Sequence, residues 1–124
     1  MTSDILQLTE HFRLTEFMCP CCQRIKVVNE FEPHVDMLQE MRDRLGYGVH
    51  VTSGYRCKKH NKAVGGAKNS MHRRFATDVQ PTDRDPEKLR EMIALAEQIG
   101  FTGIGTYKSW VHLDVRPGKA RWQG

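Results

Sequence analysis

The sequence predicts a small α+β domain, an antiparallel sheet of roughly four strands with helices packed on one face. Two observations predict this class. Residues 33–45 and 86–99 repeat apolar side chains with helical spacing, and short segments at 48–53, 74–79, 102–107 and 110–115 have the composition of strands. The length of 124 residues suits one domain, residues 1–124, with a modest core.

The composition is ordinary for a soluble globular protein, with 39% hydrophobic and 27% charged residues. No apolar run is long enough for a membrane span, so none is expected. Residues 1–7 lack the basic and apolar regions of a signal peptide, which predicts synthesis in the cytoplasm. Nothing in the sequence indicates an interface between copies, and we expect a monomer.

The net charge of +4 is a mild solubilising excess that also favours an anionic partner. Nucleic acid is one such partner. The basic residues are scattered, and the only doublets are Lys58-Lys59 and Arg73-Arg74. Because no stripe of basic and aromatic residues is present, we expect no nucleic-acid binding.

In the first half of the chain, residues 1–13 are expected to form an extended arm, followed by a single helical turn near Thr15. The helix at 33–45 has Pro33 in its first turn, an apolar stripe, and Gly46 after its end. A strand at 48–53 and a short helix at 57–64 follow.

In the second half, the strand at 74–79 is followed by the most regular helix of the chain. Asp85 is its expected cap, Pro86 lies in its first turn, and Gly100 ends it. Strands 102–107 and 110–115 are expected to pair with each other. Residues 118–124 are expected to be a mobile or lightly docked tail.

Two separate segments carry a candidate metal site. His72 and Asp78 lie in the stretch 70–78, and His112 lies on the last predicted strand. Two histidines and one aspartate can hold Zn²⁺ with a fourth position open for water, which then loses its proton near neutral pH. Asp114 is two residues beyond His112, so both side chains are expected on the same face of the strand.

These residues belong to a longer pattern, formed by Ser53-Gly54-Tyr55-Arg56, by residues 60–66, by Asn69-Ser70-Met71-His72, and by Ala76 and Asp78. The pattern resembles the zinc D-Ala-D-Ala carboxypeptidase family, which shares its metal site with lysostaphin-type peptidases and hedgehog amino-terminal domains. The resemblance runs from Leu8 to Trp122. It implies a hedgehog/DD-peptidase type zinc site with His72, Asp78 and His112 as ligands.

The resemblance also implies roles around the metal. Arg56 is expected to hold a substrate carboxylate, as a guanidinium fork can, although it could instead bond loop carbonyls. Ser70 is expected to donate to a ligand or to the substrate, although it could instead cap its own turn. The implied reaction is hydrolysis of a peptide bond in the peptidoglycan stem or cross-bridge, by a D-Ala-D-Ala carboxypeptidase or an endopeptidase.

The chain departs from the family pattern at three positions. His72 and Asp78 are six residues apart where the family has seven, and Phe75 occupies the place of a glycine. Ser109 stands three residues before His112, where many members have the acidic residue that serves as general base. Asp114 is then the expected catalytic carboxylate, as base or as a group that orients His112. The alternative is a non-catalytic, zinc-containing module that binds the cell wall.

A second metal site is suggested by the cysteines. Cys19 and Cys22 form a C-x-x-C pair, and Cys57 and His60 form a C-x-x-H pair, which together match a structural zinc site. A disulfide from Cys57 to one of the first three cysteines, or simple buried thiols, are the alternatives. A zinc-stabilised nucleic-acid-binding protein built on this set is the remotest hypothesis.

A compact domain of this kind resembles a phage or prophage endolysin or a small virion-associated wall hydrolase. We therefore expect the protein to act at the cell wall, after phage lysis or from the virion. The sequence carries no recognisable code for the bond that is cleaved.

Overall fold

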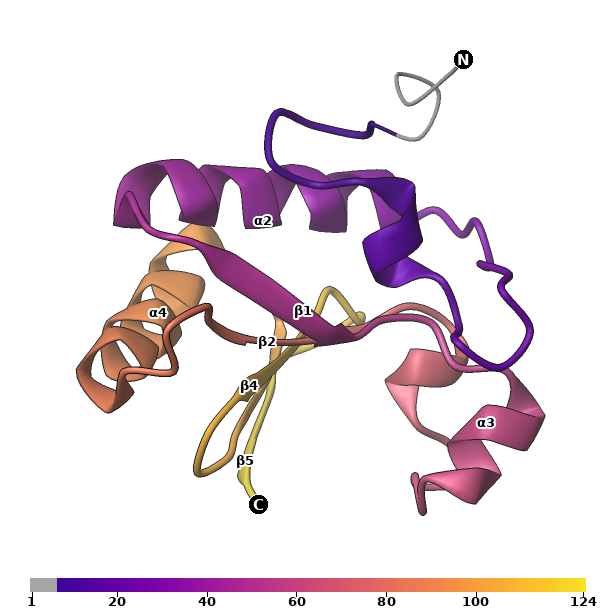
Figure 1. Ribbon diagram of the computed structural model, residues 1–124. Helices are drawn as coiled ribbons and strands as arrows, with labels where there is room; N and C mark the ends of the chain where they lie inside the picture. The colour runs from indigo at the N-terminus through magenta and orange to yellow at the C-terminus, as the bar shows by residue number, and fades with distance from the viewer. Residues whose placement is uncertain (1–6) are drawn as a thin grey trace.

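The structure, a computed structural model, describes residues 7–124, so residues 1–6 of the expected arm lie outside the described part. Two 3₁₀ helices, three α-helices and five strands follow one another (Figure 1). In chain order they are η1 (Leu14–Phe17), α2 (Phe31–Leu45), β1 (Val49–Ser53), α3 (Lys58–Ala63), η2 (Met71–Arg73), β2 (Thr77–Pro81), α4 (Pro86–Ile99), β3 (Gly103–Thr106), β4 (Val111–Asp114) and β5 (Ala120–Gln123).

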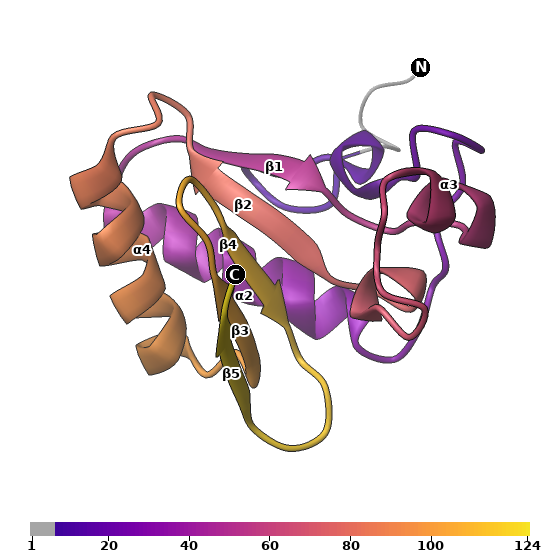
Figure 2. The same cartoon turned by 90° about the horizontal axis from the view of Figure 1, so that it is seen from below.

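The five strands form one sheet in the order β1-β2-β4-β3-β5. The pairs among the first four strands are antiparallel, as expected, but β5 lies parallel to β3. Figure 2 shows α2 crossing behind the sheet and α4 beside it, whereas α3 lies at the opposite end. The α+β class is therefore confirmed, with a fifth strand that the sequence did not indicate. None of the helices in residues 7–124 is long and apolar enough to cross a membrane.

The expectation of a mobile or lightly docked tail at 118–124 is wrong for most of the segment. The backbone N–H of Ala120 donates to the carbonyl of Thr102, and that of Gly124 donates to the carbonyl of Thr106. These bonds satisfy the backbone groups along the free side of β3, which would otherwise be an open sheet edge. The segment brings Trp122 to the face of the sheet that carries the metal candidates.

The two long helices begin and end for the reasons that the sequence indicated. The Asp85 side chain accepts a hydrogen bond from the N–H of Glu87, and α4 ends at Gly100 in a left-handed conformation. Helix α2 ends in the same way at Gly46, but it begins at Phe31, two residues earlier than predicted. Pro33 therefore still lies in the first turn.

The core between α2 and the sheet contains a group of aromatic rings around Phe75. Phe75 is fully buried, and its ring lies 4.7–5.7 Å, between centroids, from those of Phe17, Phe31 and His34. Phe12 is buried as well, and the amide groups of Leu8 and Thr9 both donate to its carbonyl. The described part of the expected extended arm thus folds back as a turn that packs on the core.

Candidate metal centre

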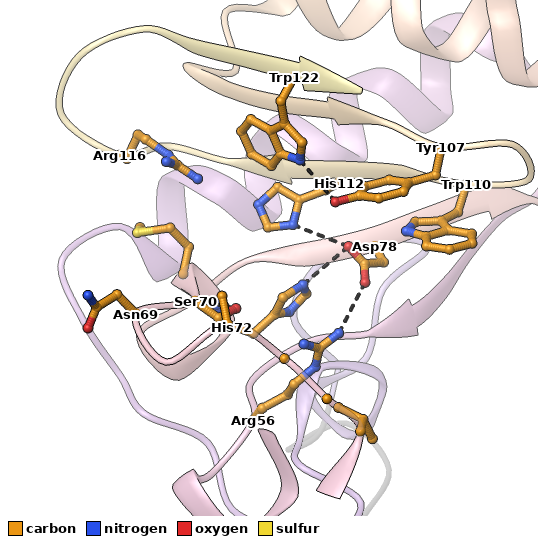
Figure 3. Close-up of a pocket in the computed structure, with 15 residues that line it drawn as sticks. Arg56, Asn69, Ser70, His72, Asp78, Tyr107, Trp110, His112, Arg116 and Trp122 are labelled. Carbon is orange, nitrogen blue, oxygen red and sulfur yellow. Dashed lines mark hydrogen bonds and ion pairs between the residues drawn. The ribbon is translucent and has the colours of Figure 1, made fainter. Parts of the chain in front are cut away.

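Three side chains from different elements converge on one point. His72 lies in η2, Asp78 in β2 and His112 in β4, and Asp78 and His112 face each other in the β2–β4 register. Nε2 of His72 lies 3.2 Å from Oδ1 of Asp78, and Nδ1 of His112 lies 3.3 Å from the same oxygen (Figure 3). All three side chains are nearly buried.

Hydrogen bonds behind the two imidazoles determine which ring nitrogen faces this point. Nδ1 of His72 lies 2.7 Å from the carbonyl oxygen of Gly54, and Nε2 of His112 lies 2.7 Å from Oδ2 of Asp114. Both oxygens can only accept, so these nitrogens carry the protons. In the neutral rings, the lone pairs of His72 Nε2 and His112 Nδ1 are then directed to the point of convergence, as metal ligands require.

The short connection between His72 and Asp78 is accommodated without separating the two side chains. His72 lies in the single turn η2, and Arg74 adopts an unusual backbone conformation (φ −102°, ψ −81°) that ends the turn. Phe75 then points into the core, so β2 begins only at Thr77. The buried ring of Phe75, which stands where a glycine was expected, fixes the segment between His72 and Asp78 to the core. Asp78 still lies beside His72.

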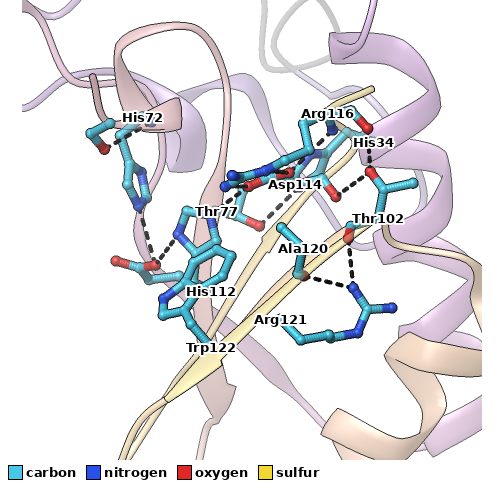
Figure 4. A network of polar contacts seen from close by, with 12 residues as sticks. His34, His72, Thr77, Thr102, His112, Asp114, Arg116, Ala120, Arg121 and Trp122 are labelled. Carbon is cyan, nitrogen blue, oxygen red and sulfur yellow. Dashed lines mark hydrogen bonds and ion pairs between the residues drawn. The ribbon is translucent and has the colours of Figure 1, made fainter. Parts of the chain in front are cut away.

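Asp114 lies behind His112 and is fully buried. Besides the bond to His112, its carboxylate accepts the guanidinium of Arg116 through Nε at 2.8 Å and through NH2 at 2.6 Å, and the Arg116 backbone N–H at 3.1 Å (Figure 4). Burial alone would raise the pKa of Asp114, but the bonds from Arg116 and His112 hold it well below its usual range. An ionised, fully bonded carboxylate in this position suits orientation of His112 better than proton transfer in the pocket.

The charges at the point of convergence also suit a cation. Burial alone would raise the pKa of Asp78, but the adjacent imidazoles of His112 and His72 hold it well below its ordinary value. For His112, burial acts to lower the pKa, and the bonds to Asp114 and Asp78 raise it above the ordinary value. Asp78 is thus an anion to which two imidazoles are directed, and a metal can replace the proton on His112 Nδ1.

Two glycines of β3 leave space for the residues around His112. A Cβ at Gly103 would lie 2.1 Å from the Asp114 carboxylate, and one at Gly105 would lie 2.3 Å from the Trp122 ring. Since Gly105 pairs with His112 on one side and with Trp122 on the other, the indole reaches the imidazole, with ring centroids 5.0 Å apart. Side chains at these positions would displace the supports of His112.

Arg56, the predicted substrate-binding residue, lies beside the candidate ligands. Its Nε donates to Ser53 Oγ at 3.1 Å, its NH1 to Asn61 Oδ1 at 3.3 Å, and its NH2 to Asp78 Oδ2 at 3.4 Å. The guanidinium has five N–H groups, so hydrogens remain that can bind another group. Arg56 lines the pocket and also holds the oxygen of Asp78 that the histidines do not contact.

Ser70, the other predicted substrate-binding residue, lies at the start of η2 and lines the pocket. Its Oγ accepts a hydrogen bond from the backbone N–H of His72 at 3.2 Å. The hydroxyl therefore caps the turn that presents His72, which was the alternative reading of this residue. Its own proton remains available to an acceptor in the pocket.

The site opens into a pocket of about 530 Å³. Its walls include three aromatic residues that sequence reasoning did not assign to the site: Tyr107, Trp110 and Trp122. The rings of Tyr107 and Trp110 stack, with centroids 4.6 Å apart and planes 7° apart, and the indole N–H of Trp122 donates to the Tyr107 hydroxyl at 2.9 Å. Figure 3 shows this hydroxyl directed toward His112 and Asp78. The only feature of the sequence that could have indicated these three residues is that they are aromatic and flank His112.

No second carboxylate reaches the pocket among the described residues that line it, where Asp78 is the only acidic side chain. Ser109 lies exposed in the short turn between β3 and β4, next to Trp110. Neither Ser109 nor Asp114 lines the pocket. The position of the usual acidic residue is therefore occupied by a side chain that faces solvent.

The three converging side chains fit Zn²⁺ by ligand chemistry and by distance. Two nitrogens and one carboxylate oxygen form the ligand set of many catalytic zinc sites. Ligand atoms about 2.0–2.1 Å from a tetrahedral Zn²⁺ lie about 3.3 Å from one another. The separations of 3.2 and 3.3 Å from Asp78 Oδ1 match this spacing.

The structure also brings together Cys19, Cys22 and Cys57, whose sulfurs all lie within 4.8 Å of one another. This group is separate from the one formed by His72, Asp78 and His112. None of the cysteines in the described residues forms a disulfide. His60, which the sequence suggested as the fourth member of the set, is not part of the group.

A family model described as peptidase M15 matches residues 10–114. The matched segment contains all three converging side chains, together with Arg56 and Asp114. No curated protein matches the chain.

Proposed function

The chain belongs to the peptidase M15 family of zinc D-Ala-D-Ala carboxypeptidase type, and from that premise we propose that it hydrolyses a peptide bond in the stem peptide or cross-bridge of peptidoglycan. Membership makes the chain a metallopeptidase. The observation that carries the proposal is the convergence of His72 Nε2 and His112 Nδ1 on Asp78 Oδ1 at the base of a pocket.

His72, Asp78 and His112 would hold the zinc ion. When bound, Zn²⁺ supplies a Lewis acid that lowers the pKa of water and polarises a carbonyl group. Gly54 and Asp114 keep each imidazole in the tautomer that can bind metal. Arg56 holds the second oxygen of Asp78, so that Oδ1 remains directed to the histidines.

We assign Asp114 the orienting role and not that of general base. It is fully buried, it does not line the pocket, and Arg116 occupies both of its oxygens. A base must lie within hydrogen-bond reach of the proton that it takes, directly or through one water. Among the described pocket residues, Asp78 is the only carboxylate, and its two oxygens already face the histidines and Arg56, so the pocket wall itself offers no free carboxylate as a base.

Tyr107 is proposed to donate a hydrogen bond to the substrate. Its hydroxyl oxygen accepts from Trp122, which leaves the phenolic proton free for an acceptor. A donor aimed at the carbonyl oxygen of the scissile bond stabilises the charge that develops there. The stacked Trp110 fixes the orientation of the phenol ring.

The pocket favours an anionic peptide. Arg56 and Arg116 line it against a single carboxylate, Asp78, and a bound zinc ion adds further positive charge. A guanidinium with free N–H groups suits the terminal carboxylate of a D-Ala-D-Ala stem, which favours a carboxypeptidase. If the enzyme is an endopeptidase, a carboxylate of the stem peptide or cross-bridge would bind to this guanidinium instead. The cell wall is the proposed place of action, because that is where this substrate occurs.

The second candidate is a non-catalytic module that binds wall peptides through the same zinc site. The observation that favours it is the exposed Ser109 at the usual position of the acidic residue. In that case the pocket would bind a wall peptide, and the chain would release no product.

Digestion of purified peptidoglycan separates these possibilities. The zinc-loaded protein is incubated with several wall types, with and without a chelator, and the products are identified by mass. We expect chelator-sensitive release of D-Ala, or of stem and cross-bridge fragments for an endopeptidase. His72→Ala should be inactive, whereas His50→Ala, which changes an exposed histidine of β1, should retain activity. Intact walls after digestion by folded, zinc-loaded protein would support the binding module.

A further inference from the structure

A tight turn presents the first two members of the cysteine group. In the segment Cys19-Pro20-Cys21-Cys22, the N–H of Gln23 donates to the carbonyl of Cys19 at 2.7 Å, and the N–H of Cys19 donates to the carbonyl of Arg24 at 2.8 Å. Gln23 adopts a left-handed conformation with φ 56°, which is uncommon for a residue other than glycine. In this turn the sulfurs of Cys19 and Cys22 lie within 4.8 Å of each other.

Backbone N–H groups donate to two of the three clustered cysteine sulfurs. The N–H of Cys57 donates to Sγ of Cys19, and the N–H of His60 donates to Sγ of Cys57, both at 3.4 Å. Thiolates are the form in which cysteine binds metals.

We propose that Cys19, Cys22 and Cys57 bind a structural Zn²⁺ ion, with Cys21 as the fourth ligand. Sulfurs bound at about 2.3 Å to a tetrahedral zinc lie about 3.8 Å apart, a separation compatible with three sulfurs that all lie within 4.8 Å of one another. Cys21 adjoins Cys22 in the same turn, and its exposed thiol lies outside the group of three in this structure. His60 contributes its backbone N–H to the site and not its ring.

A metal explains the group better than a disulfide does. A disulfide joins two sulfurs, which would leave the rest of the set as thiols in a turn that gathers them. A four-coordinate zinc uses the whole set, as closed structural sites do. The two cysteines of the C-x-x-C spacing and the distant Cys57 then all have a role.

The site would connect the amino-terminal segment to the loop that supports the catalytic centre. The N–H of Tyr55 donates to the carbonyl of Phe17 at 2.9 Å, so the two segments already lie against each other. The same loop provides the Gly54 carbonyl that orients His72, and Arg56 directly precedes Cys57. A zinc ion at the cysteines would hold this loop in place without taking part in the reaction.

Metal content tests the proposal independently of peptidase activity. Zinc per chain is measured by mass spectrometry in the full-length protein, which should contain two ions. His72→Ala should lose one ion and retain the other, and the double variant Cys19→Ser/Cys22→Ser should do the reverse. One ion in the wild type, absent from the folded His72→Ala variant, would overturn the proposal while leaving the proposed function intact.

Two further measurements keep the proposal testable if the cysteine variant does not fold. Cobalt-loaded His72→Ala, with all cysteines present, should show a strong thiolate-to-cobalt charge-transfer band, and its absence would overturn the site. Titration of the denatured, metal-free chain should find all four thiols, whereas only two would reveal a disulfide in place of the metal.

The fourth ligand is tested with a matched pair of variants. Cys21→Ser should release zinc to a competing chelator faster than the wild type, and His60→Ala should release it at the wild-type rate. Faster release from His60→Ala alone would show that the ring is the ligand and would overturn the assignment of Cys21.

Discussion

Nε2 of His112 lies 2.7 Å from Oδ2 of Asp114, a carboxylate with no exposed surface. This contact holds the proton on Nε2 and directs Nδ1 to Asp78, which lies 3.3 Å away. Arg116 in turn holds both oxygens of Asp114. A chain of three charged or polar groups thus runs from the pocket wall to the metal site.

Asp114→Asn should weaken zinc binding at the histidines and lower activity by roughly tenfold to a hundredfold, as such supporting residues typically do. The amide can donate to His112 in place of accepting from it, which favours the wrong tautomer. The measurement compares the zinc dissociation constant with kcat at saturating zinc. Unchanged zinc affinity combined with loss of the acidic limb of the pH–rate profile would instead identify Asp114 as the general base.

Tyr107→Phe removes one hydroxyl and leaves the stack on Trp110. We expect kcat to fall on the order of tenfold to a thousandfold, as for other donors to a developing oxyanion, with zinc content unchanged. Tyr107→Phe also breaks the hydrogen bond between Trp122 and the Tyr107 hydroxyl. Trp122→Phe is the control for that loss, because it removes the indole N–H and keeps the phenol. Equal kcat in Tyr107→Phe and the wild type would exclude the donor role.

Arg56→Lys keeps the positive charge but cannot make the forked contacts of the guanidinium. If Arg56 binds the substrate carboxylate, KM for a stem peptide should rise more than tenfold. If Arg56 serves only to hold Asp78, zinc affinity should fall and KM should stay the same. Steady-state kinetics of the zinc-loaded variant, paired with a zinc titration, distinguish the two results.

Phe75→Ala should destabilise the protein by about 3–5 kcal/mol, the usual cost of emptying a buried phenylalanine site. Phe75 is fully buried among the rings of Phe17, Phe31 and His34. Phe75→Leu fills more of the space and should cost less. Urea unfolding measures both, and a free energy of unfolding equal to that of the wild type would contradict the anchoring role of the ring.

Glu30 and Arg74 join the start of α2 to the residue that follows η2 through a two-pronged ion pair. The bond from Arg74 lowers the pKa of Glu30 below its ordinary value. A lowered folded-state pKa adds stability above the unfolded value of about 4.3, and this stability is lost as the pH falls toward the folded value. Glu30→Gln should therefore have a lower Tm than the wild type at pH 7, with the difference shrinking below about pH 4.3. A difference that does not change with pH would show that the carboxylate charge contributes nothing.

The helices and the inner strands could be predicted from the sequence because local signals specify them. Asp85, Pro86 and Gly100 mark the ends of α4, and apolar periodicity identifies its buried face. β5 escaped prediction because its apolar and polar residues alternate over only four positions, Ala120 to Gln123, which is too short a signal to stand out. Its position depends on the free edge of β3, a feature that exists only once the sheet has formed.

The metal candidates could be proposed from residue types and spacing, but their supports could not. That His72 Nδ1 bonds to the Gly54 carbonyl depends on a contact across 18 residues of chain. The contribution of Trp122 to the pocket likewise depends on the β3–β5 pairing and on the absence of a side chain at Gly105. The sequence also suggested His60 for the cysteine site, since spacing alone does not reveal that its backbone, and not its ring, contacts Cys57.

Anomalous diffraction at the zinc absorption edge, from crystals of the zinc-loaded protein, tests the central claim most directly. We predict a peak bonded to His72 Nε2, His112 Nδ1 and an oxygen of Asp78, within the pocket that contains Tyr107 and Arg56. A map without a peak at these three residues, from crystals whose zinc content is verified, would contradict the account.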